Sequence, residues 1–207
     1  MLKHKFLTTS IALLSLGMLS AQEQEQEKSL YIKGNALLAP IGVINVGLEK
    51  QLTSKITLQG DVLVSPWKSF AGHEMQYYSL SVEGRYYFNQ TFKGFYLGAN
   101  IAVSAFNAQK WSYWSDSPTT DEFGRTFITS NLYQKGYSYI LGVTAGYQFR
   151  LSDRLNMDIY GSIGSSQDFY KGYDRPSGER YDVAKKFNKS GEIIPYRGGV
   201  MISYKLK

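Results

Sequence analysis

The stretch Gln76–Asn89 reads QYYSLSVEGRYYFN, and it decides the fold expected for this chain. Its side chains alternate in character along the stretch. One face carries Tyr78, Leu80, Val82, Gly84, Tyr86 and Phe88, and the other carries Tyr77, Ser79, Ser81, Glu83, Arg85 and Tyr87. A period of two places successive side chains on opposite faces of a β-strand. The stretch therefore predicts a strand whose two faces meet different surroundings.

Seven further segments of the chain repeat this alternation. They cover residues 30–38, 43–52, 56–65, 95–106, 137–150, 155–165 and 194–207. Alternating segments of about ten residues are typical of transmembrane β-strands, whose barrels have short turns at one end and longer loops at the other. Tight turns at 52–55, 89–94 and 151–154 alternate here with long connections at 66–75, 107–136 and 166–193. We therefore expect an all-β protein: a single closed antiparallel up-and-down transmembrane β-barrel of about eight strands over residues 30–207, with the long connections as extracellular loops.

The first 21 residues have the features of a secretory signal peptide. Lys3 and Lys5 provide a positive start, Phe6–Leu19 is mostly apolar, and Ala21 is a small residue before a polar run. A membrane-anchoring helix is the alternative, but the apolar run is shorter than the about 20 residues that span a bilayer. We expect cleavage after Ala21, a flexible leader over residues 22–29, and localisation in the outer membrane of a Gram-negative bacterium.

The two kinds of face distinguish a membrane barrel from a soluble one. A lipocalin-like soluble barrel has the same alternation with its apolar face inward. Here the polar faces combine Gly, Ser and Asn with charged residues, and the apolar faces run uninterrupted, so we expect the apolar faces to meet lipid. Aromatic residues also gather near strand ends, as in the girdles of membrane barrels. They are Trp67, Tyr77, Tyr78, Phe106, Tyr137 and Tyr139 at the expected outer interface, and Tyr86, Phe88, Phe95, Phe149 and Tyr204 at the inner one.

The polar faces would line the interior, including its charged groups. These are the bases Lys33, Arg85 and Arg197 and the acids Glu49, Asp61, Glu83 and Asp158. An eight-stranded barrel is just wide enough inside for side chains to fill. A gate or proton path is one interpretation of such a set, and a packed ionic core is the other. We favour the core, because isolated buried charge is costly and pairing relieves that cost.

Several short motifs follow one another in an order that resembles a known family. They are KGNALL from Lys33, NVGLE from Asn45, SPW from Ser65, EGRYYF from Glu83 and GFYLG from Gly94. Together they resemble the domain-of-unknown-function family 3575, outer-membrane β-barrel proteins of Bacteroidota. The resemblance covers about residues 30–206, with residues 83–88 its most specific part. Ser65 stands where the family often has Asn, and residues 107–135 form a long segment for the family. The resemblance implies a fold and a location, and no activity.

Catalytic chemistry has one candidate centre. Some eight-stranded barrels modify lipid A with a Ser/His pair, and the chain after the signal has a single histidine, His73, with Ser69 and Glu74 nearby. No expected strand carries a His-x-Ser pair facing lipid, so we interpret His73 as a solvated loop residue and expect no enzyme. One histidine and no cysteine also argue against a zinc site, and we expect no cofactor.

A specific function would then reside in the loops. The connection 107–136 contains Trp111, Tyr113 and Trp114, which form either a surface that contacts a protein or glycan or rings that pack the loop onto the rim. We expect a monomeric barrel in contact with outer-membrane lipids, whose loops bind another envelope protein or a surface glycan, or stabilise the envelope. A small diffusion channel is the remaining alternative. The net charge of +6 is spread along the chain, unlike the basic patch of a nucleic-acid-binding protein.

Overall fold

The computed structural model of the chain describes residues 28–182 and 186–207. The expected signal peptide and all but the last two residues of the leader lie outside these ranges. The strands are β1 (Leu30–Asn35), β2 (Ile44–Gln51), β3 (Ile56–Phe70), β4 (His73–Tyr87), β5 (Gly94–Ala108), β6 (Pro118–Thr120), β7 (Thr126–Ile128), β8 (Leu132–Arg150), β9 (Leu155–Asp174) and β10 (Asn188–Lys205). Three single-turn 3-10 helices complete the elements: η2 (Ala39–Ile41), η3 (Trp111–Tyr113) and η4 (Thr129–Asn131). Within the described ranges, no helix is long and apolar enough to cross a membrane.

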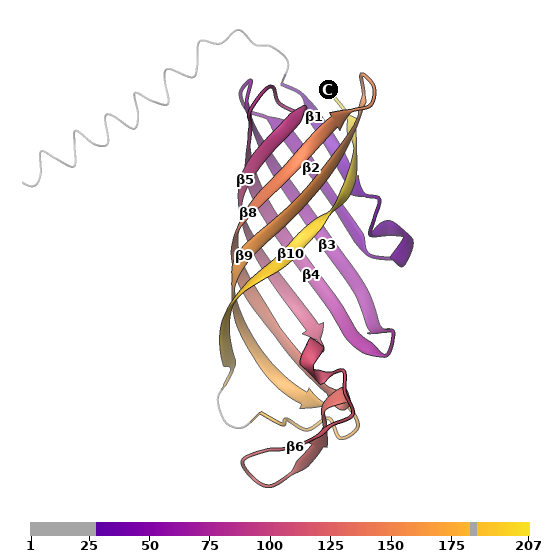
Figure 1. The fold of residues 1–207 in the computed structure, drawn as a ribbon, viewed down its shortest axis with the longest axis vertical. Coiled ribbons are helices and arrows are strands. Elements are labelled where there is room, and N and C mark those ends of the chain that lie inside the picture. The colour runs from indigo at the N-terminus through magenta and orange to yellow at the C-terminus, as the bar shows by residue number, and fades with distance from the viewer. Residues whose placement is uncertain (1–27, 183–185) are drawn as a thin grey trace, which may run out of the picture.

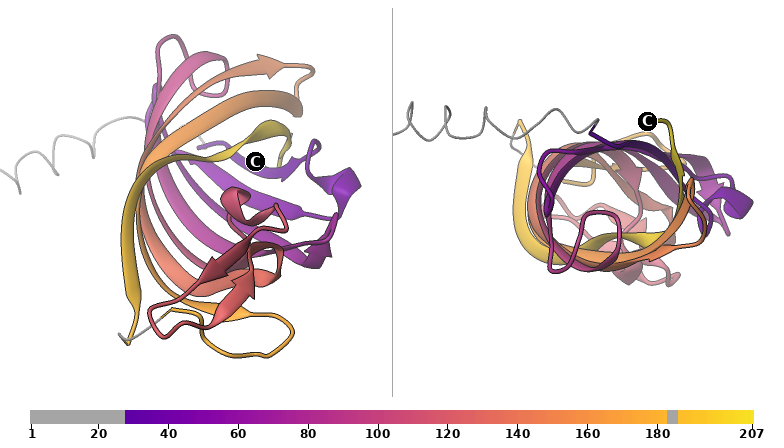
Figure 2. Two further views of the ribbon diagram at one scale, coloured as in Figure 1. Left: turned by 60° about the horizontal axis from the view of Figure 1, so that its bottom comes forward. Right: turned by 90° about the horizontal axis from the view of Figure 1, so that it is seen from above.

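Eight of the strands close into one antiparallel barrel, in the order β1-β10-β9-β8-β5-β4-β3-β2. Pairing of β1 with β10, from Tyr31 opposite Lys205 to Asn35 opposite Met201, joins the first and last strands. The ring that results is visible along the barrel axis in the right-hand view of Figure 2. The two remaining strands, β6 and β7, form a small separate hairpin between β5 and β8. The prediction of a closed antiparallel barrel of about eight strands is confirmed.

The two ends of the barrel differ. At one end, which we call the turn end, residues 52–55, 88–93 and 151–154 connect the strands. The C-terminus and β1 lie at this end, at the top of Figure 1. At the other end, the loop end, β5 is connected to β8 by a long segment that includes the β6–β7 hairpin, and β9 is connected to β10 by residues 175–187.

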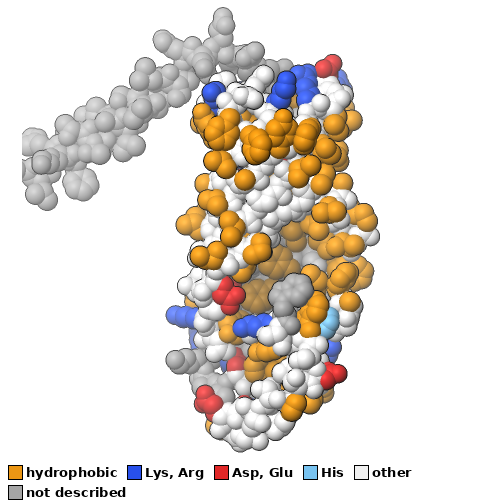
Figure 3. All heavy atoms as spheres, viewed as in Figure 1, with side chains coloured by type: hydrophobic (Ala, Val, Ile, Leu, Met, Phe, Trp, Pro, Cys, Tyr) orange, Lys and Arg blue, Asp and Glu red, His pale blue; other side chains and the backbone are white. Residues whose placement is uncertain are grey.

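The side chains that alternate in the sequence lie alternately on the outside and the inside of the barrel. On β4 the side chain of Leu80 is 54% exposed, whereas Glu83 has no exposed surface. The barrel strands repeat this pattern: most of their large aliphatic side chains are outward, and most of the inward groups are hydroxyl, amide or charged, with Leu132, Ile140 and Met201 among the buried exceptions. Figure 3 shows hydrophobic side chains spread over the barrel wall and charged ones gathered toward the two ends. The chain therefore places its apolar surface on the outside and a polar core within.

The strands extend further at the loop end than the sequence indicated. The expected loop 66–75 is almost entirely strand, because β3 continues to Phe70 and β4 starts at His73. Only Ala71 and Gly72 form the turn, with φ of 50° and 88°, the conformation of a tight hairpin. Pro66 obscured this continuation. It is tolerated because β2 pairs with β3 only as far as Val64, so one side of β3 is free there.

The other two expected loops, 107–136 and 166–193, are also shorter than predicted. The strands β5, β8, β9 and β10 run into both of them, which leaves residues 109–131 and 175–187 as connections. Aromatic and basic residues interrupt the apolar alternation in these strand ends, yet the backbone ladder between β8 and β9 continues from Leu132 opposite Asp174. Strand pairing rather than polarity decides where these strands end.

The wall is lower on the side of β1 and β2. These strands have 6 and 8 residues, against 15 or more in the other barrel strands. The connection 36–43, with η2, joins these two strands, and Leu37 and Ile41 are exposed on it. The indole Nε1 of Trp67 on β3 donates a hydrogen bond to the Ile41 carbonyl oxygen at 2.9 Å, which ties this connection to the longer neighbouring strand.

Aromatic rings occur near both ends of the outer apolar surface. Tyr139 of β8 and Phe95 of β5 are exposed near the loop end and the turn end respectively. Two residues expected in the outer girdle lie elsewhere. Tyr77 and Phe106 lie opposite each other on the strand faces that also carry the buried Ser79 and Ser104, so they face the interior. Their aromatic character indicated the outer girdle, but the alternation along β4 and β5 places them on the inward face.

Candidate functional site: the charged interior and the packed loop end

All seven charged residues predicted for the interior lie inside the barrel. Their strands are β1, β2, β3, β4, β9 and β10, and each residue is inward because it lies in the polar phase of its strand. The least buried of them, Arg197, is 8% exposed. Residues that are up to 164 positions apart, from Lys33 to Arg197, are thus brought into one closed space.

The centre of the network is formed by Lys33 and two acids. Lys33 Nζ lies 2.7 Å from Glu49 Oε2 and 2.6 Å from Asp158 Oδ2, and it also donates a hydrogen bond to Gln59 Oε1 at 3.1 Å. Arg85 Nη1 contacts the same two acids, at 3.3 Å from Glu49 and 2.8 Å from Asp158. Two bases therefore share two carboxylates from β2 and β9.

Glu83 connects this centre to the second half of the network. Its Oε1 accepts from Arg85 Nε at 2.5 Å, and its Oε2 accepts from Arg197 Nη2 at 3.1 Å. Arg197 Nη1 also lies 3.3 Å from Asp61 Oδ2. All seven charged side chains are therefore joined in one chain of ion pairs. Of the four acids, Glu83 alone contacts two arginines, Arg85 in the centre and Arg197 in the second half.

Neutral donors stabilise the excess of acid, since three bases face four carboxylates. The hydroxyls of Tyr87 and Tyr96 donate to Glu49 Oε1 at 2.8 Å and to Asp158 Oδ1 at 2.9 Å. Thr144 donates to Glu83 Oε2 at 2.6 Å. The sequence-based candidate set omitted these residues, although Tyr87 and Tyr96 lie in the polar phase of their strands. These residues would have been included if the candidate set had taken in the hydroxyl-bearing residues of the polar faces as well as the charged ones.

The ring of Tyr96 also contacts a base. The Arg85 guanidinium carbon lies 4.5 Å from the centre of that ring, a cation–π contact. Gly146 on β8 leaves room for Tyr96, because a Cβ at this glycine would overlap the ring and its hydroxyl. The side chains that surround the network therefore fill the barrel rather than line an open passage.

Two arginine nitrogens at the network lack a hydrogen-bond acceptor. Arg85 Nη2 and Arg197 Nε are buried and donate a hydrogen bond to no acceptor among the described residues. Both guanidinium groups already pair with two or more acids through their other nitrogens. The arrangement thus holds fixed charges in place. Within the described residues, no group of three or more His, Asp or Glu side chains is placed to hold a metal ion.

At the loop end, Tyr113 and Trp114 of the proposed binding surface each contact another aromatic ring of the protein. Trp114 stacks on His73 with 4.2 Å between ring centroids and 7° between ring planes, although the indole remains 47% exposed. Tyr113 meets Tyr181 of the 175–187 connection edge-on, and their hydroxyls lie 3.3 Å apart. The side chain of Trp111 lies outside what the structure describes. Of the three residues, only Trp114 therefore offers a described exposed ring.

His73 is not the solvated loop residue that we expected from the sequence, but packs against other side chains at the barrel rim. It is the first residue of β4 and is half-buried. Its Nδ1 lies 2.8 Å from Gln109 Oε1, and its ring stacks on Trp114. Gln109 in turn donates to the carbonyl oxygens of Tyr113, at 3.1 Å, and Ser130, at 2.7 Å. His73 thus anchors the start and end of the long connection to the rim.

The β6–β7 hairpin is organised around Asp121. Its carboxylate accepts backbone N–H bonds from Phe123 and Arg125, both at 2.9 Å, and a side-chain bond from Arg125 Nε at 2.7 Å. Desolvation acts against the charged form, but these hydrogen bonds and the guanidinium prevail and lower the pKa of Asp121. Arg125 also pairs with Glu179 at 3.2 Å, which joins the two loop-end connections. Burial, the largest cause, raises the pKa of Tyr181 between these connections.

Comparison with known proteins identifies a family for this chain. The family model described as "Protein of unknown function (DUF3575)" matches residues 9–206. Searches among curated proteins and among solved structures give no match. Because the family model covers nearly the whole chain, this β-barrel protein belongs to the DUF3575 family of proteins of unknown function.

Proposed function

We propose that this protein is an outer-membrane β-barrel that does not conduct solutes through its centre and that acts at its loop end, as a binding or envelope-stabilising protein. One observation carries the proposal: an apolar outer wall surrounds an interior filled with paired charges. A soluble barrel of this size would have the reverse arrangement, with apolar side chains inside and polar ones outside.

The dimensions of the wall support a membrane location. A transmembrane β-strand needs about 9–11 residues at a tilt near 45°. The strands β3, β4 and β5 have 15 residues each, and β8 and β9 have 19 and 20, so these strands span the apolar layer and project beyond it. The backbone groups of β4, β5, β8 and β9 pair with a neighbouring strand on each side, as a lipid environment requires, and those of β3 do so as far as Val64.

The filled interior argues against a diffusion channel. Lys33, Glu49, Asp158 and Arg85 occupy the cross-section with no more than 1% exposure each. A solute would have to break several ion pairs inside a low-dielectric wall, which is strongly unfavourable. The lipid A-modifying alternative relied on His73, whose ring instead stacks on Trp114 and contacts Gln109. Both alternatives are therefore weaker than a non-conducting, non-enzymatic barrel.

The orientation follows from the two ends. The turn end has short connections and the C-terminus, which suits the periplasmic side, and the loop end has the longer, cross-linked connections, which suits the cell surface. Loops on a rigid scaffold usually carry recognition, so a partner would meet the loop end. Trp114 and the β6–β7 hairpin are the exposed features there.

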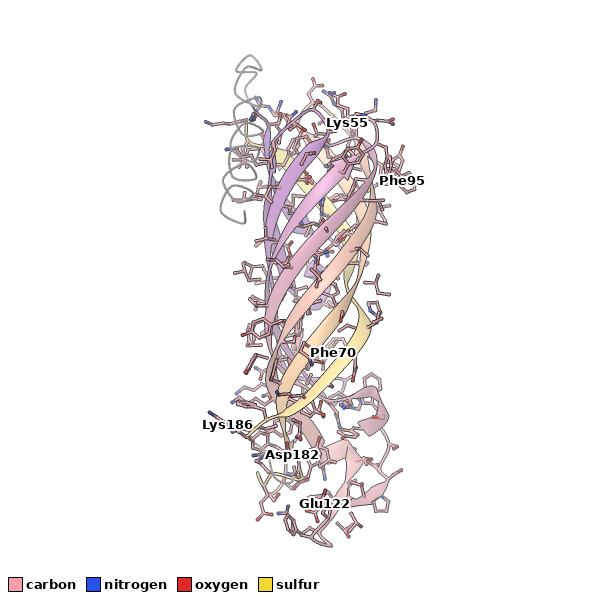
Figure 4. The ribbon with its side chains drawn as sticks, turned by 90° about the vertical axis from the view of Figure 1, so that its left-hand side faces the viewer. Lys55, Phe70, Phe95, Glu122, Asp182 and Lys186 are labelled. Carbon is pink, nitrogen blue, oxygen red and sulfur yellow. The ribbon has the colours of Figure 1, made fainter. Side chains whose placement is uncertain are left out.

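A cysteine-labelling experiment tests location and orientation together, because the chain has no cysteine of its own. Glu122 lies at the loop end and Lys55 at the turn end (Figure 4). We expect Glu122→Cys to react with a membrane-impermeant maleimide on intact cells and Lys55→Cys to react only after the outer membrane is permeabilised. Equal labelling of both variants on intact cells would refute the orientation, and recovery of the protein in the soluble fraction would refute the membrane location.

A conductance measurement tests the filled interior. The barrel reconstituted in a planar bilayer should show no single-channel steps, whereas a general porin reconstituted in parallel should show them. Reproducible steps from the wild-type barrel would overturn the non-conducting part of the proposal without affecting the membrane location.

A further inference from the structure

The outer face of β8 changes character as it approaches the loop end. Its exposed outward side chains run from Leu141 through Tyr139 to Tyr137, and the next outward residue is Lys135. Lys135 lies directly opposite Lys171 of β9. Like charges placed directly opposite each other destabilise a pair of strands. An anionic group bound outside the protein would reduce the repulsion between these two lysines.

Aromatic rings hold the ammonium groups at this position. Phe169 stacks on Tyr137 with 5.2 Å between centroids, and Phe187 packs against the same tyrosine at 5.8 Å. Lys171 Nζ lies 5.2 Å from the centre of the Phe187 ring. Lys189 of β10, which pairs with Phe169 in the sheet, has its Nζ 5.6 Å from the centre of that ring. Lys171 and Lys189 thus lie on one aromatic surface, and Lys135 of the neighbouring strand lies directly opposite Lys171.

Three carboxylates of the surrounding elements have other partners. Asp182 pairs with Arg180, and Glu74 pairs with Arg175. Asp168, on the inward face of β9, accepts hydrogen bonds from two serine hydroxyls. Among the described residues, none of the three lysines lies within ion-pair distance of a carboxylate. Lys186, three residues before Lys189, is also exposed and projects outward at the loop end (Figure 4).

We infer that Lys135, Lys171 and Lys189, here called the lysine cluster, bind the phosphate groups of a phosphorylated glycolipid in the outer leaflet of the membrane. The inference rests on the proposed membrane location and orientation. Aromatic side chains mark the interface between hydrocarbon and headgroups, so cations one residue beyond them reach headgroup phosphates. Lysine keeps its apolar stem along such a surface while the ammonium group remains in the polar layer. Three ammonium groups supply both the charge and the donors that a phosphate requires.

The test compares lipids that differ only in phosphate. The mature barrel in non-ionic detergent is mixed with purified phosphorylated lipid A, with the same lipid A after removal of its phosphates, or with inorganic phosphate, and bound species are measured by native mass spectrometry. We expect the wild type to prefer the phosphorylated glycolipid. The Lys135→Gln, Lys171→Gln, Lys189→Gln triple variant should bind it on the order of 100-fold more weakly, because each lysine at an anionic surface contributes about fivefold.

A matched variant at the other end controls for overall charge. Lys50→Gln, Lys55→Gln and Lys93→Gln remove the same three charges at the turn end, where Lys55 Nζ also lies 6.0 Å from the centre of an aromatic ring, that of Tyr86. This variant should bind the phosphorylated glycolipid as the wild type does. All variants are first checked for the shift in gel mobility on heating that a folded barrel shows.

Three outcomes would overturn the inference. They are equal binding of dephosphorylated lipid A, full retention of binding by the lysine-cluster variant, and equal binding of inorganic phosphate, which would indicate a site for a free anion. Failure of the proposed function is separable from these outcomes. If Glu122→Cys is labelled on intact cells and lipid binding shows no phosphate preference, only the present inference fails.

Discussion

Replacement of Glu83 by glutamine should destabilise the barrel more than the loss of a hydrogen bond between two uncharged side chains of its interior. Glu83 accepts hydrogen bonds from Arg85 at 2.5 Å, Arg197 at 3.1 Å and Thr144 at 2.6 Å, with no exposed surface. Glutamine has the same shape but no charge. Arg197 would then have only Asp61, at 3.3 Å, as an acidic partner.

The expected magnitude follows from the burial of the network. Removal of one partner from a buried ion pair costs about 3–5 kcal/mol, because the other charge remains buried. Arg197→Met should have an effect of similar size, since it deprives both Glu83 and Asp61 of a cation. The double variant loses one charge of each sign, so we expect it to be less destabilised than the sum of the single variants, by about 2 kcal/mol. Ser138→Ala, which removes one neutral hydrogen bond to Ser104, is the control and should cost about 1 kcal/mol.

Urea unfolding of the barrel in phospholipid vesicles, followed by tryptophan fluorescence and by gel mobility without heating, measures these differences. The reasoning would be refuted if both charged single variants unfolded within about 0.5 kcal/mol of the wild type. Such a result would mean that water solvates the interior charges, and the same variants should then be tested for conductance.

Three further predictions concern single features. Gly146→Ala should destabilise the barrel by about 1–3 kcal/mol in the same urea assay, because its Cβ would overlap Tyr96, whereas Gly84→Ala, which meets only open space, should not. Deletion of residues 112–130 should leave the heat-dependent gel shift intact, since the β5–β8 ladder does not involve them; loss of the shift would mean that the loop is needed for assembly. The pKa of Asp121 is lowered, so its charged carboxylate stabilises the folded hairpin at pH values above the ordinary carboxyl pKa, and this stabilisation is lost as the pH falls through the lowered pKa. Limited proteolysis of the hairpin should therefore accelerate in acid in the wild type. In Asp121→Asn the rate of proteolysis should not depend on acid.

The strand-by-strand division of residues was available from the sequence alone. Alternation is a local property, because the backbone of a strand turns each successive side chain to the opposite face. Glu83 and Arg85 therefore had to share a face, and the same reasoning assigned Lys33, Glu49 and Asp158 to the interior once the apolar faces were turned outward. The eight segments and their antiparallel order followed from the same pattern together with the short turns.

The partners of these residues could not be read in the same way. Lys33 and Asp158 are 125 positions apart, and they meet only because β1 pairs with β10 and so closes the ring. The strand ends at Phe70 and Asp174 and the stack of Trp114 on His73 likewise depend on pairing across strands and loops. The sequence by itself determined which side chains face inward, since that depends on one strand at a time. Only the tertiary structure decided which charge meets which, because register, tilt and closure are properties of all eight strands together.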